Sequence, residues 1–443
     1  MAKKFKNDEY MLIGEDENFL YHISTGIFMN LSREDFKLTK NSIEIINDEI
    51  NEYIDKSCDI SKNQLKVTNT LASLQFMSSE CCNMKCKYCY ANEGTYNSQL
   101  VNKFFDYNKY LKYYNEISRK YSGGIKTISF FGGEPLLNFI EIKKFIDNLY
   151  EQQKYHEYSI VTNGTITNPE IFEMLKKQKF KITVSLDGPK DINDINRIDS
   201  NNHGTFDIVS HFIDELNFIG IKPTIEMTIT DEHIKHYSKG CAEKWLKIFE
   251  RFEINGYATF LVVDKSIKYN SKELKKIKNL FEEFVDIFFD DIIHGKSYLN
   301  LKILKMVYGI INKIYQKDCG SGRSITISND GYIYPCQMFV NDTNYRMHID
   351  SFKVNCGESS LFSDFNAYRT NVDTCKECTV RNFCGVWCKG LNFLNNDSIN
   401  IPIDSRCYTE KILFNRIIEK LCLIKGEDLK DFKKNIRIAV QNK

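Results

Sequence analysis

Residues 72–89, ASLQFMSSECCNMKCKYC, join a predicted strand to three closely spaced cysteines. Three residues separate Cys82 from Cys86, and two separate Cys86 from Cys89. Thiolates at this spacing can wrap one loop around a cubane iron–sulfur cluster. Three ligands for four irons leave one iron open, so a further molecule can bind there. A zinc site, the structural alternative, requires four closed ligands.

From residue 72 onward the chain alternates strands with amphipathic helices, which is the rhythm of a parallel sheet. The predicted strands are 72–77, 126–131, 158–162, 181–186, 222–230 and 257–263. The predicted helices lie near 106–119, 139–153, 168–177, 205–219 and 234–250. We therefore expect an α/β fold with a partial (β/α)6 TIM-like barrel. Such barrels carry their chemistry on the loops that follow the strands.

The segments on either side of the predicted barrel have a different pattern. Short alternating strands are expected at 10–13, 19–23 and 27–30, and isoleucines at helical spacing follow from Ile43 to Ile54. This pattern predicts a winged-helix-like N-terminal module. After the barrel, helices near 271–292 and 298–316 lead into a cysteine-rich tail with few strands. The expected domains are 1–70, 71–297 and 298–443.

Composition limits the classes of function that the chain can have. Of its 443 residues 42% are hydrophobic and 27% charged, and its net charge of +1 argues against nucleic-acid binding. No apolar run is long enough to cross a membrane, and the N-terminus has no signal-peptide pattern. We expect a cytoplasmic protein. Of the fifteen cysteines, twelve lie in 81–89 and 319–407, and in a reducing cytosol such spacing indicates metal binding rather than disulfides.

A second motif, Gly132-Gly133-Glu134-Pro135, follows the second predicted strand. About fifty residues after the cysteine loop, it makes the region resemble the radical S-adenosylmethionine (SAM) superfamily, whose cluster loop also has an aromatic residue before its third cysteine, here Tyr88. The resemblance implies a 4Fe–4S cluster on the three cysteines, and SAM bound to its open iron. It also implies that the two glycines let the backbone approach the methionine amino group of SAM, and that Glu134 accepts a hydrogen bond from that group.

Two later segments resemble further cofactor contacts of the superfamily. Asn163, after the third predicted strand, matches a segment that passes the ribose of SAM. Ser185 and Asp187, with Arg197 downstream, match the segment that holds the ribose and the carboxylate. Two ordinary interpretations stay open, since Asp187-Gly188 could be a plain turn and Arg197 a surface ion pair. These residues are expected to bind the cofactor, and the sequence assigns no catalytic residue.

The second cysteine zone resembles the SPASM domain, an extension of some radical SAM enzymes that carries two auxiliary 4Fe–4S clusters. Its members here are Cys319, Cys336, Cys375, Cys378, Cys384, Cys388 and Cys407. In the family's interleaved pattern, one cluster is held by Cys375, Cys378, Cys384 and Cys407. The other is held by Cys319, Cys336 and Cys388, and is one ligand short. Either Cys356 supplies that ligand, or the position is open to a substrate thiolate. A zinc ribbon is the alternative, but its two cysteine pairs normally lie further apart.

Enzymes with this extension mostly modify peptides or proteins. Anaerobic sulfatase-maturing enzymes, which make formylglycine, have an Asp directly after the cysteine that corresponds to Cys336, whereas this chain has Gln337. Maturases of ribosomally made peptides often carry a winged-helix element that binds the precursor's leader as an added strand. The sequence therefore favours a peptide maturase that joins a cysteine sulfur to carbon in a thioether.

The expected partners and the alternative functions follow from this ranking. The predicted partners are a precursor peptide, bound through its leader, and an electron donor such as flavodoxin or ferredoxin; no nucleic-acid or membrane partner is expected. The alternatives are sulfatase maturation, a carbon–carbon crosslink and an epimerisation. A non-catalytic iron–sulfur scaffold belongs to another class, and the intact Gly-Gly-Glu-Pro motif speaks against it, because electron transfer alone does not require that motif.

Overall fold

The fold was described from a computed structural model of the chain. The structure describes residues 3–6, 9–13, 19–39, 42–56, 69–96, 103–314, 319, 323–355, 358–359, 365, 372–385 and 388–441. Cys58 and Cys356 lie outside these ranges. No helix within them is both long and apolar enough to cross a lipid bilayer.

A nine-stranded sheet forms the centre of the protein, in the order β12-β11-β10-β9-β8-β7-β13-β14-β15. Six consecutive strands of this sheet run parallel to one another, namely β7 (Leu71–Ser79), β8 (Ile125–Gly132), β9 (Glu157–Thr162), β10 (Lys181–Ser185), β11 (Thr224–Ile229) and β12 (Gly256–Leu261). These are the six predicted strands, so the expected partial barrel is confirmed.

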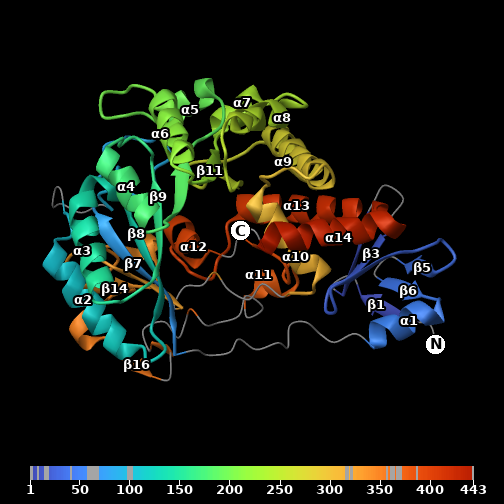
Figure 1. The fold of residues 1–443 in the computed structure, drawn as a ribbon. Coiled ribbons are helices and arrows are strands. Elements are labelled where there is room, and N and C mark those ends of the chain that lie inside the picture. Colours follow the sequence, from blue (N-terminus) through green and yellow to red (C-terminus); the bar gives the residue numbers. More distant parts are fainter. Residues whose placement is uncertain are drawn as a thin grey trace.

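Helices connect the parallel strands and cover their outer face, as Figure 1 shows for the helices after β7, β8 and β9. They are α2 (Tyr107–Lys120), α3 (Phe139–Glu151), α4 (Pro169–Lys177), α5 (Lys190–Asn196), α6 (Phe206–Phe218), α7 (Asp231–His236), α8 (Cys241–Leu246) and α9 (Ser271–Ile293). The buried Phe76 of β7 packs edge-on against Phe105 and Phe145, at ring distances of 5.4 and 5.6 Å. Such aromatic packing fixes the strand after which the cysteine loop begins.

The C-terminal region extends the central sheet. Its elements are α10 (Leu301–Ile311), β13 (Ser324–Ile327), β14 (Tyr332–Tyr334), β15 (Met347–His348), β16 (Val354–Asn355), β17 (Glu358–Ser359), α11 (Asp373–Lys376), α12 (Lys389–Asn396), α13 (Asp404–Leu423) and α14 (Gly426–Gln441). Strand β13 pairs in parallel with β7, and Ser324 faces Ser73 in the register. The expectation that the C-terminal tail has few strands was therefore wrong for residues 324–348, because this part of the tail supplies three strands of the central sheet.

The N-terminal region forms two three-stranded sheets, β1-β6-β5 and β2-β3-β4. Their elements are β1 (Lys3–Lys6), β2 (Tyr10–Ile13), β3 (Phe19–His22), β4 (Ile27–Asn30), β5 (Phe36–Thr39), β6 (Ser42–Ile45) and α1 (Asp48–Asp55). The helix expected from Ile43 was wrong in its first part, because Ser42–Ile45 is a strand. Helix α1 begins only after Asn47, whose side chain accepts hydrogen bonds from the N–H groups of Glu49 and Ile50.

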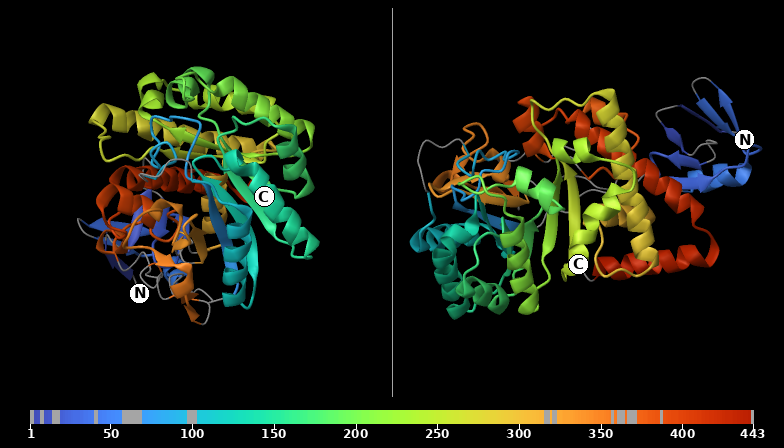
Figure 2. Two further views of the ribbon diagram at one scale, coloured as in Figure 1. Left: turned by 90° about the vertical axis from the view of Figure 1, so that its left-hand side faces the viewer. Right: turned by 90° about the horizontal axis from the view of Figure 1, so that it is seen from above.

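The sheet β2-β3-β4 is anchored to the C-terminal region. The buried Tyr21 packs against Phe414 of α13 at a ring distance of 4.9 Å, and against Phe383 at 6.4 Å. Asn382 donates a hydrogen bond to the carbonyl oxygen of Ile23. Figures 1 and 2 show these N-terminal strands beside the C-terminal helices, at the end of the molecule away from α2 and α3.

Candidate active site

A cavity of about 470 Å³ opens beside the loop that follows β7, and Cys82, Cys86 and Cys89 line it. The loop is bound to the end of α5 and the residues after it, because the N–H groups of Lys85 and Lys87 donate to the carbonyl oxygens of Ile198 and Asn196 at 2.8 and 2.9 Å. The structure thus brings all three predicted thiols to one cavity at the ends of the barrel strands.

The three thiols suit a cluster better than a single ion. Within the described ranges, no three His, Cys, Asp or Glu side chains are placed to hold one metal ion. A cubane instead takes each thiolate on a different iron, so its ligands need not converge on one point. Burial, with Glu134 as a smaller cause, raises the pKa of the Cys82 thiol to about 12, and burial also raises that of Cys86. A bound metal deprotonates such thiols outright.

The glycines of the Gly-Gly-Glu-Pro motif approach the backbone that leads into the cysteine loop. Gly133 N–H donates to Ser79 O at 2.9 Å, and Glu134 N–H donates to Cys81 O at 3.0 Å. A Cβ added at Gly132 would overlap Ser79 O, and one added at Gly133 would overlap Cys81 O. Gly132 also has a φ of +145°, which residues with a side chain rarely adopt. In this structure the atoms that these two glycines approach closely belong to the backbone of Ser79 and Cys81.

Glu134 is fully buried behind the cavity wall and organises Asn163. Its carboxylate accepts hydrogen bonds from Asn163 N–H at 2.7 Å, the Thr162 hydroxyl at 2.8 Å and Leu136 N–H at 3.0 Å. Burial raises the pKa of Glu134 to about 7, although these donors oppose the shift. The amide of Asn163 lines the cavity and donates to Asn83 Oδ1 at 2.9 Å. Pro135, the last residue of the motif, begins a short 3-10 helix and is buried.

A buried chain of polar contacts connects Asp187, Tyr88 and Arg197. The Tyr88 hydroxyl donates to Asp187 Oδ2 at 2.6 Å and accepts from Arg197 Nη1 at 2.8 Å. Thr228 N–H donates to the other carboxylate oxygen of Asp187 at 3.0 Å. Only 6% of Arg197 is exposed, so the surface ion pair left open above is wrong. Arg197, Tyr88 and Ser185 all line the cavity, whereas Asp187 supports it from behind.

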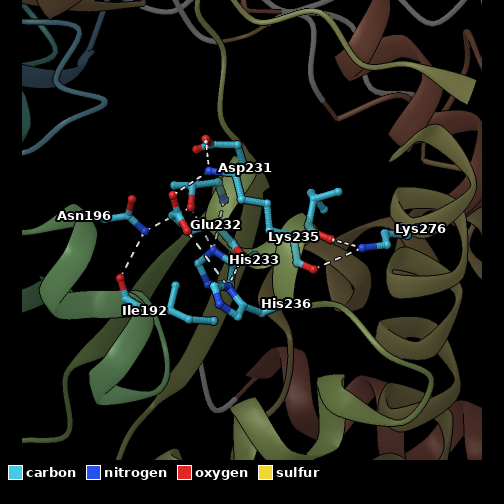
Figure 3. Close-up of polar contacts among 10 residues, drawn as sticks. Ile192, Asn196, Asp231, Glu232, His233, Lys235, His236 and Lys276 are labelled. Atoms are coloured by element: carbon cyan, nitrogen blue, oxygen red, sulfur yellow. Dashed lines mark hydrogen bonds and ion pairs between the residues drawn. The ribbon is translucent and has the colours of Figure 1, made fainter. Parts of the chain in front are cut away.

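Helix α7 holds the backbone of Asp187 in place. His233 lies on α7, and its Nε2 donates to the carbonyl oxygen of Asp187 at 3.0 Å, while its Nδ1 accepts from Thr230 N–H. Asn196 donates to Ile192 O and to Thr230 Oγ1, which joins α5 to the same cluster (Figure 3). Burial lowers the pKa of His233, in keeping with a neutral ring that donates through Nε2. Sequence reasoning missed His233, because nothing around it matches a motif.

Removing the Tyr88 hydroxyl is expected to weaken SAM binding. Tyr88→Phe leaves Asp187 and Arg197 buried without the group that bridges them, and hydrogen bonds to charged groups contribute about 1.5–3 kcal/mol. We expect the KM for SAM to rise about tenfold or more, measured from 5′-deoxyadenosine formation. Tyr121→Phe is the control, because the buried Tyr121 hydroxyl has no hydrogen-bond partner among the described residues. Equal KM values for the two variants would contradict the role of the bridge.

The structure also brings together cysteines of the second zone. The pKa of the Cys407 thiol is raised to about 12. Burial is the largest cause, and the nearby thiols of Cys384, Cys375 and Cys378 contribute less. These are the four residues predicted for one auxiliary cluster. In the second predicted set, burial raises the pKa of Cys388, with Cys319 as the next cause. Cys336 lies close to the start of α12, since a Cβ added at Gly390 would be 3.3 Å from its sulfur. The rival ligand Cys356 lies outside the described residues.

Comparison with known proteins agrees with this geometry. Residues 77–236 match the model of the Radical SAM superfamily. The chain is 25% identical to a cysteine-type anaerobic sulfatase-maturating enzyme of Clostridium perfringens over 369 residues, which is 78% of this chain and 95% of the relative. It is 21% identical to the radical SAM cyclopropyl synthase TigE of Paramaledivibacter caminithermalis, covering 85% of this chain and 83% of that protein.

Two solved structures share the fold. Native anSMEcpe with bound AdoMet matches with a TM-score of 0.65 at 21% identity, covering 84% of this chain and all of that one. SuiB of Streptococcus suis bound to S-adenosylmethionine matches with a TM-score of 0.54 at 17% identity, covering 81% of each chain. The family match, the cysteine loop and the barrel together identify a radical SAM domain in this chain, which is an enzyme that also has a cysteine-rich C-terminal region.

Proposed function

We propose that the enzyme oxidises a cysteine side chain of a peptide or protein substrate, as the name of its cysteine-type sulfatase-maturating relatives describes. The observation that carries this proposal is similarity over nearly the full length of those relatives, of which the chain covers 95–97%. Solved structures of anSMEcpe with a bound Cp18Cys peptide and with a bound Kp18Cys peptide share the fold, with TM-scores of 0.64 and 0.63. These relatives favour the alternative named above over the thioether maturase that the sequence ranked first.

The cavity residues fit the cofactors of this family. Cys82, Cys86 and Cys89 would hold a 4Fe–4S cluster, and the wall formed by Asn163 and Arg197 would contact SAM. When bound, the cluster and SAM would supply the radical chemistry that removes a hydrogen atom from the substrate. The chain's own residues bind and orient the reactants and exclude water. We assign the two auxiliary clusters to the second cysteine zone, where they would carry electrons to or from a donor such as flavodoxin or ferredoxin.

The reconstituted enzyme should be tested with SAM, dithionite and a cysteine-containing peptide taken from a sulfatase. Conversion of cysteine to formylglycine replaces sulfur by oxygen in the peptide, whereas thioether formation removes two hydrogens and keeps the sulfur. Mass spectrometry separates these outcomes. A serine version of the same peptide tests whether the thiol is required. Turnover of neither peptide, with 5′-deoxyadenosine still formed, would contradict the proposal.

A crosslinking maturase is the second candidate, and the N-terminal sheets favour it. Strand β5 is an edge of the sheet β1-β6-β5, and 47% of its Leu38 is exposed. An edge strand can bind an extended peptide as an added strand. In this candidate function, the edge of β5 holds the leader of a precursor peptide, while the cavity modifies the peptide's core.

Leu38→Asp is expected to lower turnover of a leader-bearing precursor at least about tenfold, since one buried leucine contributes about 1.5–3 kcal/mol to docking. SAM cleavage without peptide should not change, because the barrel is untouched. The control is Phe218→Asp, which alters an exposed apolar residue on α6 that is 87% exposed. Deleting residues 1–56 is a poorer test, since it removes Tyr21 from the core. A Leu38→Asp enzyme with normal precursor turnover would exclude docking at β5.

A further inference from the structure

Glu226 is the single carboxylate among the described residues that line the cavity. Burial along β11 alternates, so Glu226 and Thr228 face the cavity while Ile225 and Met227 are buried on the other face. In the sheet register, Glu226 lies beside Ser185 of β10 and Ala258 of β12. The cysteine loop and this carboxylate therefore open into the same space, although they are about 140 residues apart in the sequence.

The carboxylate of Glu226 has no partner within the described part of the chain. No hydrogen bond, and no ion pair within 4.0 Å, joins it to another described side chain. The positive charges of Arg406, on α13, and of Arg197 stabilise the ionised form of Glu226, whereas the negative charge of Asp187 destabilises it. Arg406 lines the same cavity, and its buried Nε also lacks a hydrogen-bond partner there. Glu226 is partly buried and lines the cavity, so its carboxylate is free to contact a molecule bound there.

Other groups in the cavity wall cannot accept a proton from a substrate. Arg197 and Arg406 are cations, and Gln337 has a neutral amide. The phenols of Tyr88, Tyr90 and Tyr96 stay protonated near neutral pH, as phenols ordinarily do, and burial raises the pKa values of Tyr88 and Tyr96 further. The three cysteines are committed to the cluster. Glu226 is left as the group with basic oxygen atoms, and burial raises its pKa above the ordinary value, toward the range in which a base is effective.

We infer that Glu226 is the catalytic base of this cavity, and that it takes the proton of the substrate thiol. In this step the S–H bond breaks, its electron pair stays on sulfur, and an O–H bond forms on the Glu226 carboxylate. Arg406, which lines the same cavity, would stabilise the thiolate. The inference rests on the proposed function, because it names the residue that prepares a peptidyl cysteine for oxidation.

The test compares Glu226→Gln with the wild-type holoenzyme, using the cysteine peptide described above. General bases contribute about 10²–10⁴-fold, so oxidised peptide should form at least about 100-fold more slowly, while 5′-deoxyadenosine should form within a few-fold of the wild-type rate. The wild-type rate of peptide oxidation should rise with pH as Glu226 loses its proton, and the variant should lack this rise. Glu226→Asp should retain part of the activity. Glu243→Gln, on α8 outside the cavity, is the control.

A second measurement does not require turnover. The infrared difference between wild type and Glu226→Gln isolates the carboxyl band of Glu226, and adding the cysteine peptide should raise its protonated fraction. The same peptide with alanine in place of cysteine should leave the band unchanged. An unchanged band with the cysteine peptide overturns the inference. Parallel loss of peptide oxidation and of 5′-deoxyadenosine in Glu226→Gln also overturns it, since the residue would then bind SAM. A wild type that binds the peptide and protonates Glu226 but forms no product contradicts the proposed function alone.

Discussion

Replacing Cys82, Cys86 and Cys89 together by alanine is expected to abolish 5′-deoxyadenosine formation and to remove about four of about twelve irons per chain. Cys81, the remaining described thiol of the loop, does not line the cavity, and it is hydrogen-bonded to Ser79 at the end of β7. Loss of all three ligands removes the iron to which SAM binds. Iron analysis after anaerobic reconstitution and chromatography of the nucleoside products measure both effects.

Cys422→Ala is the matched control, because Cys422 lies on α13 outside both predicted ligand sets. Its iron content and its rate of SAM cleavage should equal those of the wild type. Unchanged iron in the triple variant would show that the cluster is held elsewhere. A wild type with only about four irons would exclude the auxiliary clusters while leaving the first one intact.

Gly133→Ala is expected to lower SAM cleavage about 100-fold or more, because displacing reactants by about 1 Å can cost that much. The new Cβ would overlap Cys81 O and lie 2.8 Å from Gly94 Cα. Both neighbours are backbone atoms, so neither can move aside by rotating a side chain. The loop carrying Cys82 must shift instead, and the geometry of the three thiols shifts with it.

Gly309→Ala provides the control for this variant. In helix α10, a Cβ at Gly309 would come no closer than 3.4 Å to Ile314 O. Alanine favours a helix over glycine by about 1 kcal/mol, so thermal stability should be equal or higher and SAM cleavage normal. Wild-type kinetics in Gly133→Ala would show that the cysteine loop is more adaptable than its packing indicates.

Much of the barrel could be predicted from the sequence because its strands are long runs with clear boundaries. Strand β13 could not, since Ser324–Ile327 is only four residues long and its partner lies about 250 residues earlier. Strand β6 was assigned to a helix because Ile43, Ile45 and Ile50 fit both helical and alternating patterns. A strand there is stabilised by pairing with β1 and β5, which no local window contains.

Part of the candidate site could likewise be predicted from the sequence, and part of it could not. Contiguous motifs identified the cysteine loop and Glu134, because each lies within a few residues of a predicted strand. The bridge from Tyr88 to Arg197 spans 109 positions and depends on how two loops meet. Glu226 carries a weak signal that was missed, namely an acidic residue at an alternating position inside the otherwise uncharged strand Thr224–Ile229. Its significance depends on which face of that strand is turned toward the thiols.

The pairing of β13 with β7 has a consequence for synthesis of the chain on the ribosome. One edge of β7 pairs with β8, but the other has no partner until residues 324–327 emerge, long after the barrel strands. An unpaired strand edge is a template for aggregation, and contacts this distant in sequence form slowly. A nascent or prematurely ended chain that stops before residue 323 therefore exposes β7, next to the cysteine loop, to other chains in the cell.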